Sequence, residues 1–249
     1  PGNTCNFACR MCNPVTSSSW YADGYELERH GLASTSWYDQ EHVSHANSLT
    51  FNEYTRTFEN VRNSFNRDNT EFWSTLKSWI KNLVYIDIYG GEPFLTPALF
   101  DLLEHGVSIG ASKHVELSLH TNGSVYDQHY LEILRQYKRV QFKISLDSDQ
   151  AAELEYIRYR AKYDQVIENG KKFKEFFAPY TNVEMGVTCT VVPFNVYSID
   201  RIVTGLNDMF GLPVGRNIVT TPEYDIRHLP QPVKNRSEEH TSELQSRVD

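Results

Sequence analysis

The sequence predicts an α/β protein built around one parallel sheet, and two observations lead to this prediction. Short runs rich in β-branched and aromatic residues alternate along the chain with helix-like segments of roughly 10–15 residues. Such an alternation is typical of βαβ units, in which helices join parallel strands. The length also fits, because 249 residues, of which 40% are hydrophobic, can bury one sizeable core.

Five segments are predicted to be strands because they are rich in Val, Ile, Leu and aromatic residues. They are Leu83–Tyr89, Val115–Thr121, Val140–Asp147, Val183–Val192 and Arg216–Thr221. Helical patterns follow these strands over residues 97–106, 127–138, 150–159, 164–177 and 198–210. Thr96 and Pro97 suit the N-cap and the first position of the earliest of these helices. We expect a further strand upstream of Pro1, missing from this fragment, which would bring the number to six.

A polar and aromatic stretch precedes the first strand, over about residues 13–69, and includes Trp20 and Trp37. A structureless loop of this length is unusual in a compact domain, so we expect part of it to be helical, with residues 52–66 as a candidate. The following segment, Thr70–Asn82, has helical spacing of its apolar residues. The insertion either covers an active site or packs against the outside of the fold.

The chain is expected to form one domain over residues 1–235, because neither a Gly/Ser-rich linker nor an internal repeat divides it. Residues 236–249 lose all apolar periodicity. We predict a disordered tail there, which resembles translated vector sequence and is not native to the protein.

The composition excludes some classes of function. The formal net charge is −8, from 24 basic and 32 acidic side chains, and basic clusters are absent from the sequence. Sequence-independent nucleic-acid binding depends on Lys and Arg contacts to phosphates, so we expect no nucleic-acid partner. No apolar run approaches the ~18 residues that a membrane-spanning helix needs, so we expect no membrane partner either.

Three of the four cysteines fall within eight positions, as Cys5, Cys9 and Cys12 in the spacing C-x3-C-x2-C. Thiols clustered this tightly in a cytoplasmic protein, as we expect this one to be, favour metal binding over disulfides. Three sulfurs are one fewer than a closed zinc site or a fully cysteine-ligated cubane requires. One interpretation is therefore a [4Fe–4S] cluster with one iron open to a small molecule. The alternative is a non-catalytic α/β module with a structural zinc site that another residue completes.

Other polar and glycine-rich residues follow the predicted strands. They are Gly90, Gly91, Glu92 and Pro93 after the first, Asn122 and Gly123 after the second, Ser145 and Asp147 at the end of the third, and Asn195 after the fourth. In parallel α/β barrels the functional residues lie at this carboxyl end of the strands. These residues and the cysteine loop are therefore expected on one rim.

The cysteine spacing, followed by a strand that ends in GGEP, resembles the radical S-adenosylmethionine (SAM) superfamily. The segments YGGEPFLTP, TNG, KISLD and EYIRYRAKYDQVIENG are similar to members with a twitch or SPASM-type C-terminal domain. The resemblance covers roughly residues 3–234 and implies a partial TIM-type (β/α)6 barrel with parallel strands. Two features depart from the usual pattern: Met11 precedes the third cysteine where an aromatic residue is usual, and the distance from Cys12 to Gly90 is long.

The resemblance also implies a reaction. A radical SAM enzyme takes an electron from a donor such as flavodoxin or ferredoxin and reductively cleaves SAM at its [4Fe–4S] cluster. The resulting 5′-deoxyadenosyl radical abstracts hydrogen from a substrate, here an unidentified peptide, carbohydrate or metabolite. The two expected cofactors are thus the cluster and SAM.

Residue roles follow from the resemblance and from side-chain chemistry. Cys5, Cys9 and Cys12 would ligate three irons. Gly90 and Gly91, beside Glu92 and Pro93, would admit the methionine moiety of SAM, and Glu92 could accept hydrogen bonds from its ammonium. Ser145 and Asp147 would bind the ribose, Arg158 the SAM carboxylate and Asn195 the nucleoside.

Structural roles are open for several of these residues. Ser145 and Asp147 also suit a strand end followed by an N-cap, and Asn122-Gly123 suits a plain turn. Arg158 could lie on a solvated helix face. For Cys189, in the middle of a predicted strand, a buried structural thiol is favoured over a ligand.

Overall fold

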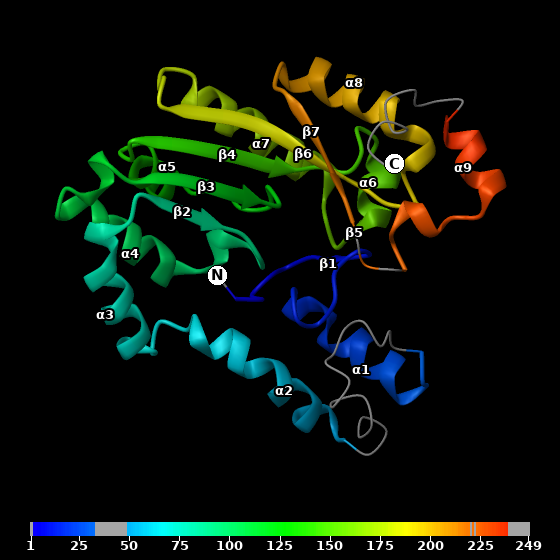
Figure 1. Ribbon diagram of the computed structural model, residues 1–249, viewed down its shortest axis with the longest axis horizontal. Coiled ribbons are helices and arrows are strands. Elements are labelled where there is room, and N and C mark those ends of the chain that lie inside the picture. The colour runs from blue at the N-terminus through cyan, green and yellow to red at the C-terminus, as the bar shows by residue number, and fades with distance from the viewer. Residues whose placement is uncertain (1, 33–48, 220, 222, 239–249) are drawn as a thin grey trace.

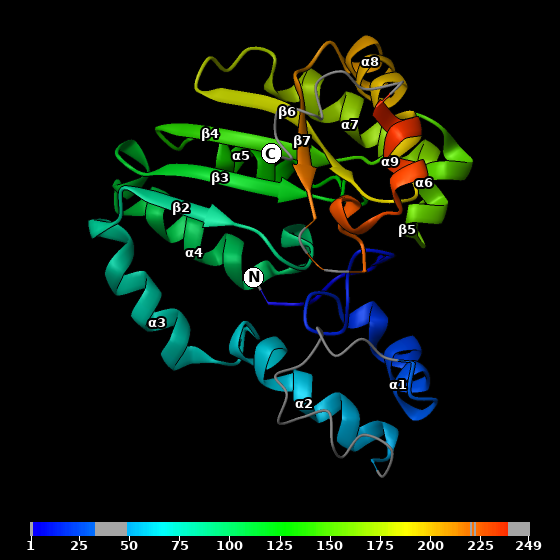
Figure 2. The same cartoon turned by 45° about the vertical axis from the view of Figure 1, so that its right-hand side comes forward.

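A computed structural model describes residues 2–32, 49–219, 221 and 223–238 of the protein (Figure 1). Five strands form one sheet, with helices α5 and α7 on one side of it, while the N-terminal segment and helix α1 lie below the strand ends in this view. Turning the molecule by 45° keeps this arrangement, with β7 crossing the sheet nearest the viewer (Figure 2).

The main sheet has the order β2-β3-β4-β6-β7, and every neighbouring pair is parallel. Its strands are β2 (Tyr85–Ile88), β3 (Glu116–Thr121), β4 (Arg139–Ser145), β6 (Val183–Val191) and β7 (Val214–Ile218). The α/β class with parallel strands is therefore confirmed. Within the described ranges β2 and β7 have no strand on their outer sides, so the sheet is open and the barrel is partial.

The helices cover the sheet and the N-terminal segment. They are α1 (Tyr21–Arg29), α2 (Phe51–Ser64), α3 (Thr70–Trp79), α4 (Pro97–Ser108), α5 (Gln128–Leu134), α6 (Ala151–Ile157), α7 (Tyr163–Phe177), α8 (Ile199–Phe210) and α9 (Gln231–Glu238). The predicted helix over 127–138 ends early, at Leu134. Helix α9 runs past Arg236, the start of the predicted tail, and positions 239–249 lie outside the described residues.

The two faces of the sheet differ because side chains alternate along a strand. On β4, Val140, Phe142 and Ile144 are fully buried, and the Phe142 ring lies 5.0 Å from Phe173 and 5.1 Å from Phe177 of α7. The residues between and after them, Gln141, Lys143 and Ser145, are polar and only half-buried. One face therefore packs on the helices, and the other is a polar wall.

The predicted helix over 150–159 is partly wrong. Helix α6 ends at Ile157, and Arg158–Tyr159 form a short strand, β5, that pairs antiparallel with β1 (Ala8–Cys9). Arg160 follows with a φ of +74°, the only positive φ at a non-glycine residue in the described part of the chain. The helical pattern is interrupted here because Arg158–Tyr159 pair with Ala8–Cys9. Local sequence alone does not predict this pairing, because the two segments lie far apart along the chain.

The insertion contributes helices α1 and α2, which pack together through aromatic rings. Tyr54 and Phe58 of α2 are buried, and the Phe58 ring stacks on Tyr21 of α1 at 5.5 Å. The predicted helix over 52–66 is thus confirmed as α2, while Trp37 lies outside the described residues. None of the helices in the described ranges is long and apolar enough to cross a membrane.

Candidate functional site: the cysteine loop and the strand ends

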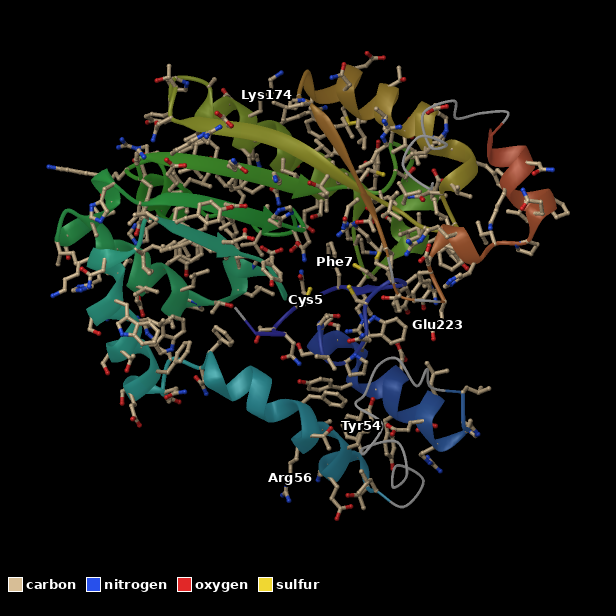
Figure 3. All side chains as sticks on the ribbon, viewed as in Figure 1. Cys5, Phe7, Tyr54, Arg56, Lys174 and Glu223 are labelled. Carbon is tan, nitrogen blue, oxygen red and sulfur yellow. The ribbon has the colours of Figure 1, made fainter. Side chains whose placement is uncertain are left out.

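The loop with the three cysteines is held by hydrogen bonds to its backbone carbonyls. Ser19 Oγ donates to the Cys5 carbonyl at 2.9 Å, and Trp20 Nε1 donates to the Cys9 carbonyl at 2.9 Å. Ser17 Oγ donates to the Phe7 carbonyl at 2.6 Å. Figure 3 shows Cys5 and Phe7 between the strand ends and α1. The start of the insertion thus supports the cysteine loop from below.

The β1–β5 pair brings a cation to the cysteines. Arg158 is the register partner of Cys9, and the Arg10 amide donates to the Ile157 carbonyl at 2.7 Å. The Arg158 side chain is 9% exposed, so the alternative of a solvated helix face is wrong. Two segments almost 150 residues apart in sequence therefore meet at the site.

The three thiols differ in their acidity. A hydrogen bond from Cys9 lowers the pKa of Cys12 to about 7, and the positive charge of Arg158 acts in the same direction. The same thiol–thiol contact, together with burial, raises the pKa of Cys9 well above its ordinary value. Burial raises the pKa of Cys5. Since thiolates are the form that binds metal, Cys12 is the thiol closest to that form at neutral pH.

Glu92 joins two strand ends. Its side chain is fully buried, and its Oε1 accepts from Thr121 Oγ1 at 2.8 Å and from the Phe94 amide at 3.1 Å. Its Oε2 accepts from the Asn122 amide at 2.7 Å. Pro93, also buried, begins the short 3-10 helix Pro93–Leu95. The carboxylate therefore ties the GGEP turn to the TNG turn.

We expect the contribution of Glu92 to stability to depend on pH. Burial raises its pKa from an ordinary value of 4.5 to about 7 in the folded protein. Between these values the folded state holds the proton more tightly than the unfolded state, so stability falls as pH rises from 4.5 to 7, by about 3 kcal/mol. In urea unfolding of the metal-free protein, wild type should lose up to about 3 kcal/mol of stability relative to Glu92→Gln as the pH rises from 4.5 to 7. A difference that is constant with pH would contradict the assignment.

Gly90 and Gly91 have positive φ angles of +87° and +56° and lie against the backbone of the cysteine segment. A Cβ on Gly91 would lie 2.5 Å from the Thr4 carbonyl oxygen, and the Glu92 amide donates to that same oxygen at 2.7 Å. The absence of side chains at the two glycines thus leaves room for the backbone of residues 2–4, in addition to any role toward a cofactor.

Gly91→Ala is expected to destabilise the docking of the cysteine loop. Gly110→Ala is a matched control, since Gly110 has a φ of +76° with nothing within 4 Å of the added Cβ. Both variants incur the left-handed strain of about 1–2 kcal/mol, but only Gly91→Ala adds a clash with backbone. Urea unfolding should show the larger loss for Gly91→Ala, and limited proteolysis should cut its N-terminal segment faster. Equal losses would mean that the loop does not dock on this turn.

Asp147 and Asn195 form a second brace, between β4 and β6. Asp147 is fully buried; its Oδ2 pairs with Arg158 Nε at 2.7 Å, and its Oδ1 accepts from the Thr190 amide at 2.7 Å. Asn195 Nδ2 donates to the Asp147 carbonyl at 3.0 Å and to the Thr190 carbonyl at 2.9 Å. Asp147 and Asn195 thus connect the ends of β4 and β6, and the Asp147 carboxylate forms the ion pair with Arg158 beside the cysteines.

Ser145 is placed differently from these residues. It is half-buried at the end of β4, in register with Thr188, and lines a cleft of about 870 Å³ over the polar wall of the sheet. Of the residues assigned to the ribose, Ser145 is therefore the one whose side chain faces open space.

Asn122 is a residue of the site that sequence reasoning left as a turn. Its Nδ2 lies 3.7 Å from Cys5 Sγ and 3.0 Å from Asn6 Oδ1, while its Oδ1 accepts from the Ser124 amide at 2.9 Å. These contacts fix the orientation of the amide and point a donor at a cysteine sulfur. The TNG motif predicted that Asn122 lies on the rim, but it did not predict the contact with Cys5.

The cysteines supply the donors for a metal or cluster at this site. All four cysteines are free, and Cys189 is buried in β6, as predicted. In the described ranges, no three His, Cys, Asp or Glu side chains are placed to hold a metal ion together. A four-iron cluster binds each thiolate through a different iron, so its ligands lie further apart than those of one ion. The three supported thiols and the adjacent cation suit such a cluster.

The family model described as the radical SAM superfamily matches residues 1–196, which is most of the chain. This chain belongs to the radical SAM superfamily. Its match covers the cysteine loop, both turns and Asn195, and so includes every candidate site residue. Among curated proteins, no sequence matches this radical SAM chain significantly.

Solved structures that match this chain have low sequence identity to it. SuiB from Streptococcus suis, bound to S-adenosylmethionine, is 16% identical, with a TM-score of 0.48 over 71% of this chain and 40% of SuiB. The protein anSMEcpe with bound AdoMet is 18% identical, with a TM-score of 0.45 over 61% of this chain and 44% of that one. The radical SAM chain described here thus spans less than half the length of these two proteins.

Proposed function

We propose that this chain is the core of a radical SAM enzyme, with a [4Fe–4S] cluster held by Cys5, Cys9 and Cys12 and SAM beside it on the rim. The observation that carries the proposal is the cysteine loop itself, which presents three thiols opposite a buried arginine. When bound, the two cofactors would supply reductive cleavage of SAM and removal of a hydrogen atom from the substrate. The electron would come from a small redox protein such as flavodoxin or ferredoxin.

The residues around the thiols divide into binding and positioning roles. Arg158 supplies positive charge beside Cys9 and Cys12 and is a candidate partner for the SAM carboxylate. Ser145 is the candidate for the ribose, because its hydroxyl faces the cleft. We assign Glu92, Asp147 and Asn195 to positioning, since their side-chain oxygens and amide already bind strand ends.

Asn122 is expected to act on the cluster. A hydrogen bond to a ligating sulfur stabilises the reduced, more negative cluster and so raises its reduction potential. The amide is already oriented toward Cys5 by its contacts with Asn6 and Ser124. Its donation to sulfur therefore requires no rearrangement of the turn.

Several finer assignments remain part of this proposal. A twitch or SPASM-type domain beyond this core, a cytoplasmic location and a peptide, carbohydrate or metabolite substrate are all proposed. Free thiols at an oxygen-sensitive centre suit the reducing cytoplasm.

The experiment is SAM cleavage by the anaerobically reconstituted chain. With dithionite and SAM, we expect a brown protein that forms 5′-deoxyadenosine. A protein that binds one equivalent of zinc and does not cleave SAM would instead identify the structural zinc module.

A further inference from the structure

The polar wall of the sheet borders a cleft, and apart from Ser145 the residues that line it have no role in the proposed function. The cleft has a volume of about 870 Å³ and is lined by residues of β3, β4, β6 and β7, among them His120, Lys143, Ser145 and Thr188. These side chains alternate with the buried residues that pack on α7, so they project from the opposite face of the sheet. Figures 1 and 2 show that this face is not the one covered by α5 and α7.

The strand register sets three of these residues in one row. His120 pairs with Lys143, and Lys143 pairs with Gly186. Gly186 has no side chain, and Pro213, which also lines the cleft, lies against it. Ser145 and Thr188 form the next row toward the rim. Lys143 on β4 thus has His120 beside it on β3 and Gly186 beside it on β6, and the hydroxyl residues Ser145 and Thr188 form the adjacent row.

The charges of the wall are not balanced at Lys143. Glu184, one row below, is taken by Arg139, whose Nη2 lies 2.7 Å from Glu184 Oε1. Asp87 is on the edge strand, in the row of Gln141 and Glu184, and not in that of Lys143. Among the described residues, Lys143 has no ion-pair or hydrogen-bond partner. A half-buried lysine whose neighbouring carboxylate, Glu184, is already paired with Arg139 attracts an anion.

His120 suits the same ligand. Burial lowers its pKa, and the positive charge of Lys143 lowers it further, against a smaller opposite effect of Asp87. The imidazole is therefore neutral at pH 7 and can donate one hydrogen bond through its protonated ring nitrogen.

From this cleft we infer that the enzyme's substrate carries an anionic group, a carboxylate or a phosphate, which Lys143 binds as an ion pair with hydrogen bonds from His120 and Thr188. The inference rests on the proposed function only in naming the ligand as the substrate. The anion site itself requires neither the cluster nor SAM.

The test is the binding of small anions to the full chain, kept anaerobic without reductant. Inorganic phosphate and glutarate are titrated separately at pH 7 by calorimetry, because they represent the two anion classes. We expect one of them to bind with a dissociation constant in the low millimolar range. Lys143→Met should weaken that binding by about tenfold or more, since it removes one charge-assisted hydrogen bond, and Lys143→Arg should retain it.

Lys138→Met is the matched control, because Lys138 is an exposed lysine that pairs with Glu116 at 2.7 Å outside the cleft. It should bind the anion as wild type does. Far-UV circular dichroism of each variant confirms that the chain is folded. Saturation by neither anion, or equal binding by Lys143→Met and wild type, would overturn the inference.

A final arm separates the substrate from SAM, which also carries a carboxylate. Anion binding that persists in the presence of saturating SAM supports a substrate site, and competition by SAM would overturn that assignment. Failure of SAM cleavage with intact anion binding would reject the proposed function and leave the anion site. The converse result would reject only the anion site.

Discussion

Replacing Cys12 by alanine is expected to abolish assembly of the iron–sulfur cluster. The wild-type chain, reconstituted without oxygen, should bind about four irons, and the variant should fall to near background, because two thiolates do not hold a cubane that normally has at least three protein ligands. Iron and sulfide analysis together with the visible absorption spectrum measures the loss. Cys5→Ala and Cys9→Ala should behave in the same way.

Cys189→Ala is the matched control for these variants. Cys189 is buried in β6, and burial raises the pKa of its thiol, so it is not available as a thiolate. The control should load as much iron as wild type. A Cys12→Ala protein with unchanged iron content and spectrum would contradict the ligand assignment.

Arg158→Met is expected to cost about 3–5 kcal/mol of stability in the metal-free protein, since it leaves the Asp147 carboxylate buried without its partner. Arg158 and Asp147 form the most buried ion pair of the described residues, with side-chain exposures of 9% and 0%. Urea unfolding under reducing, anaerobic conditions measures the change. The double variant Arg158→Met/Asp147→Asn should recover part of the loss, because no uncompensated charge remains.

An exposed ion pair of the same sheet provides the comparison. Arg139 and Glu184 have side-chain exposures of 46% and 57%, and such pairs contribute little. Arg139→Met should leave the unfolding midpoint almost unchanged. If Arg158→Met lost no more stability than Arg139→Met, the buried pair would not hold the cysteine loop and the strand ends together.

The sequence predicted the parts of the fold that depend on local pattern. The strand and helix alternation after Leu83 needs only period-2 and period-3.6 patterns, and each predicted strand is present with shifted ends. The common rim follows from the parallel topology, because all strands then end on one side. Contacts in the structure indeed link Cys5 to Asn122 and Cys9 to Arg158.

The pattern did not predict contacts between distant segments. The helix that was predicted through Tyr159 ends at Ile157 because β5 pairs with the cysteine segment, and only that pairing places Arg158 opposite Cys9. Similarly, the GGEP motif predicted a cofactor contact but not the contacts within the protein, in which its glycines lie against Gly2 and Thr4 and its carboxylate binds the TNG turn. A motif indicates which residues matter, but the residues that each one contacts depend on the tertiary structure.

The same limit applies to Lys143. Its place in the strand KISLD predicts an outward-facing residue by alternation alone. That it faces a cleft without a carboxylate partner depends on the registers of β3, β4 and β6 and on the pairing of Glu184 with Arg139.

The central claim is that the cysteine loop holds a cluster to which SAM binds directly. The most direct measurement is the electron paramagnetic resonance spectrum of the reconstituted, dithionite-reduced chain, recorded before and after SAM is added. Binding of SAM to the open iron should change the signal of the reduced [4Fe–4S] cluster, and Cys12→Ala should give no such signal. A cluster signal that SAM leaves unchanged, or no cluster signal from the wild-type chain, would contradict the claim.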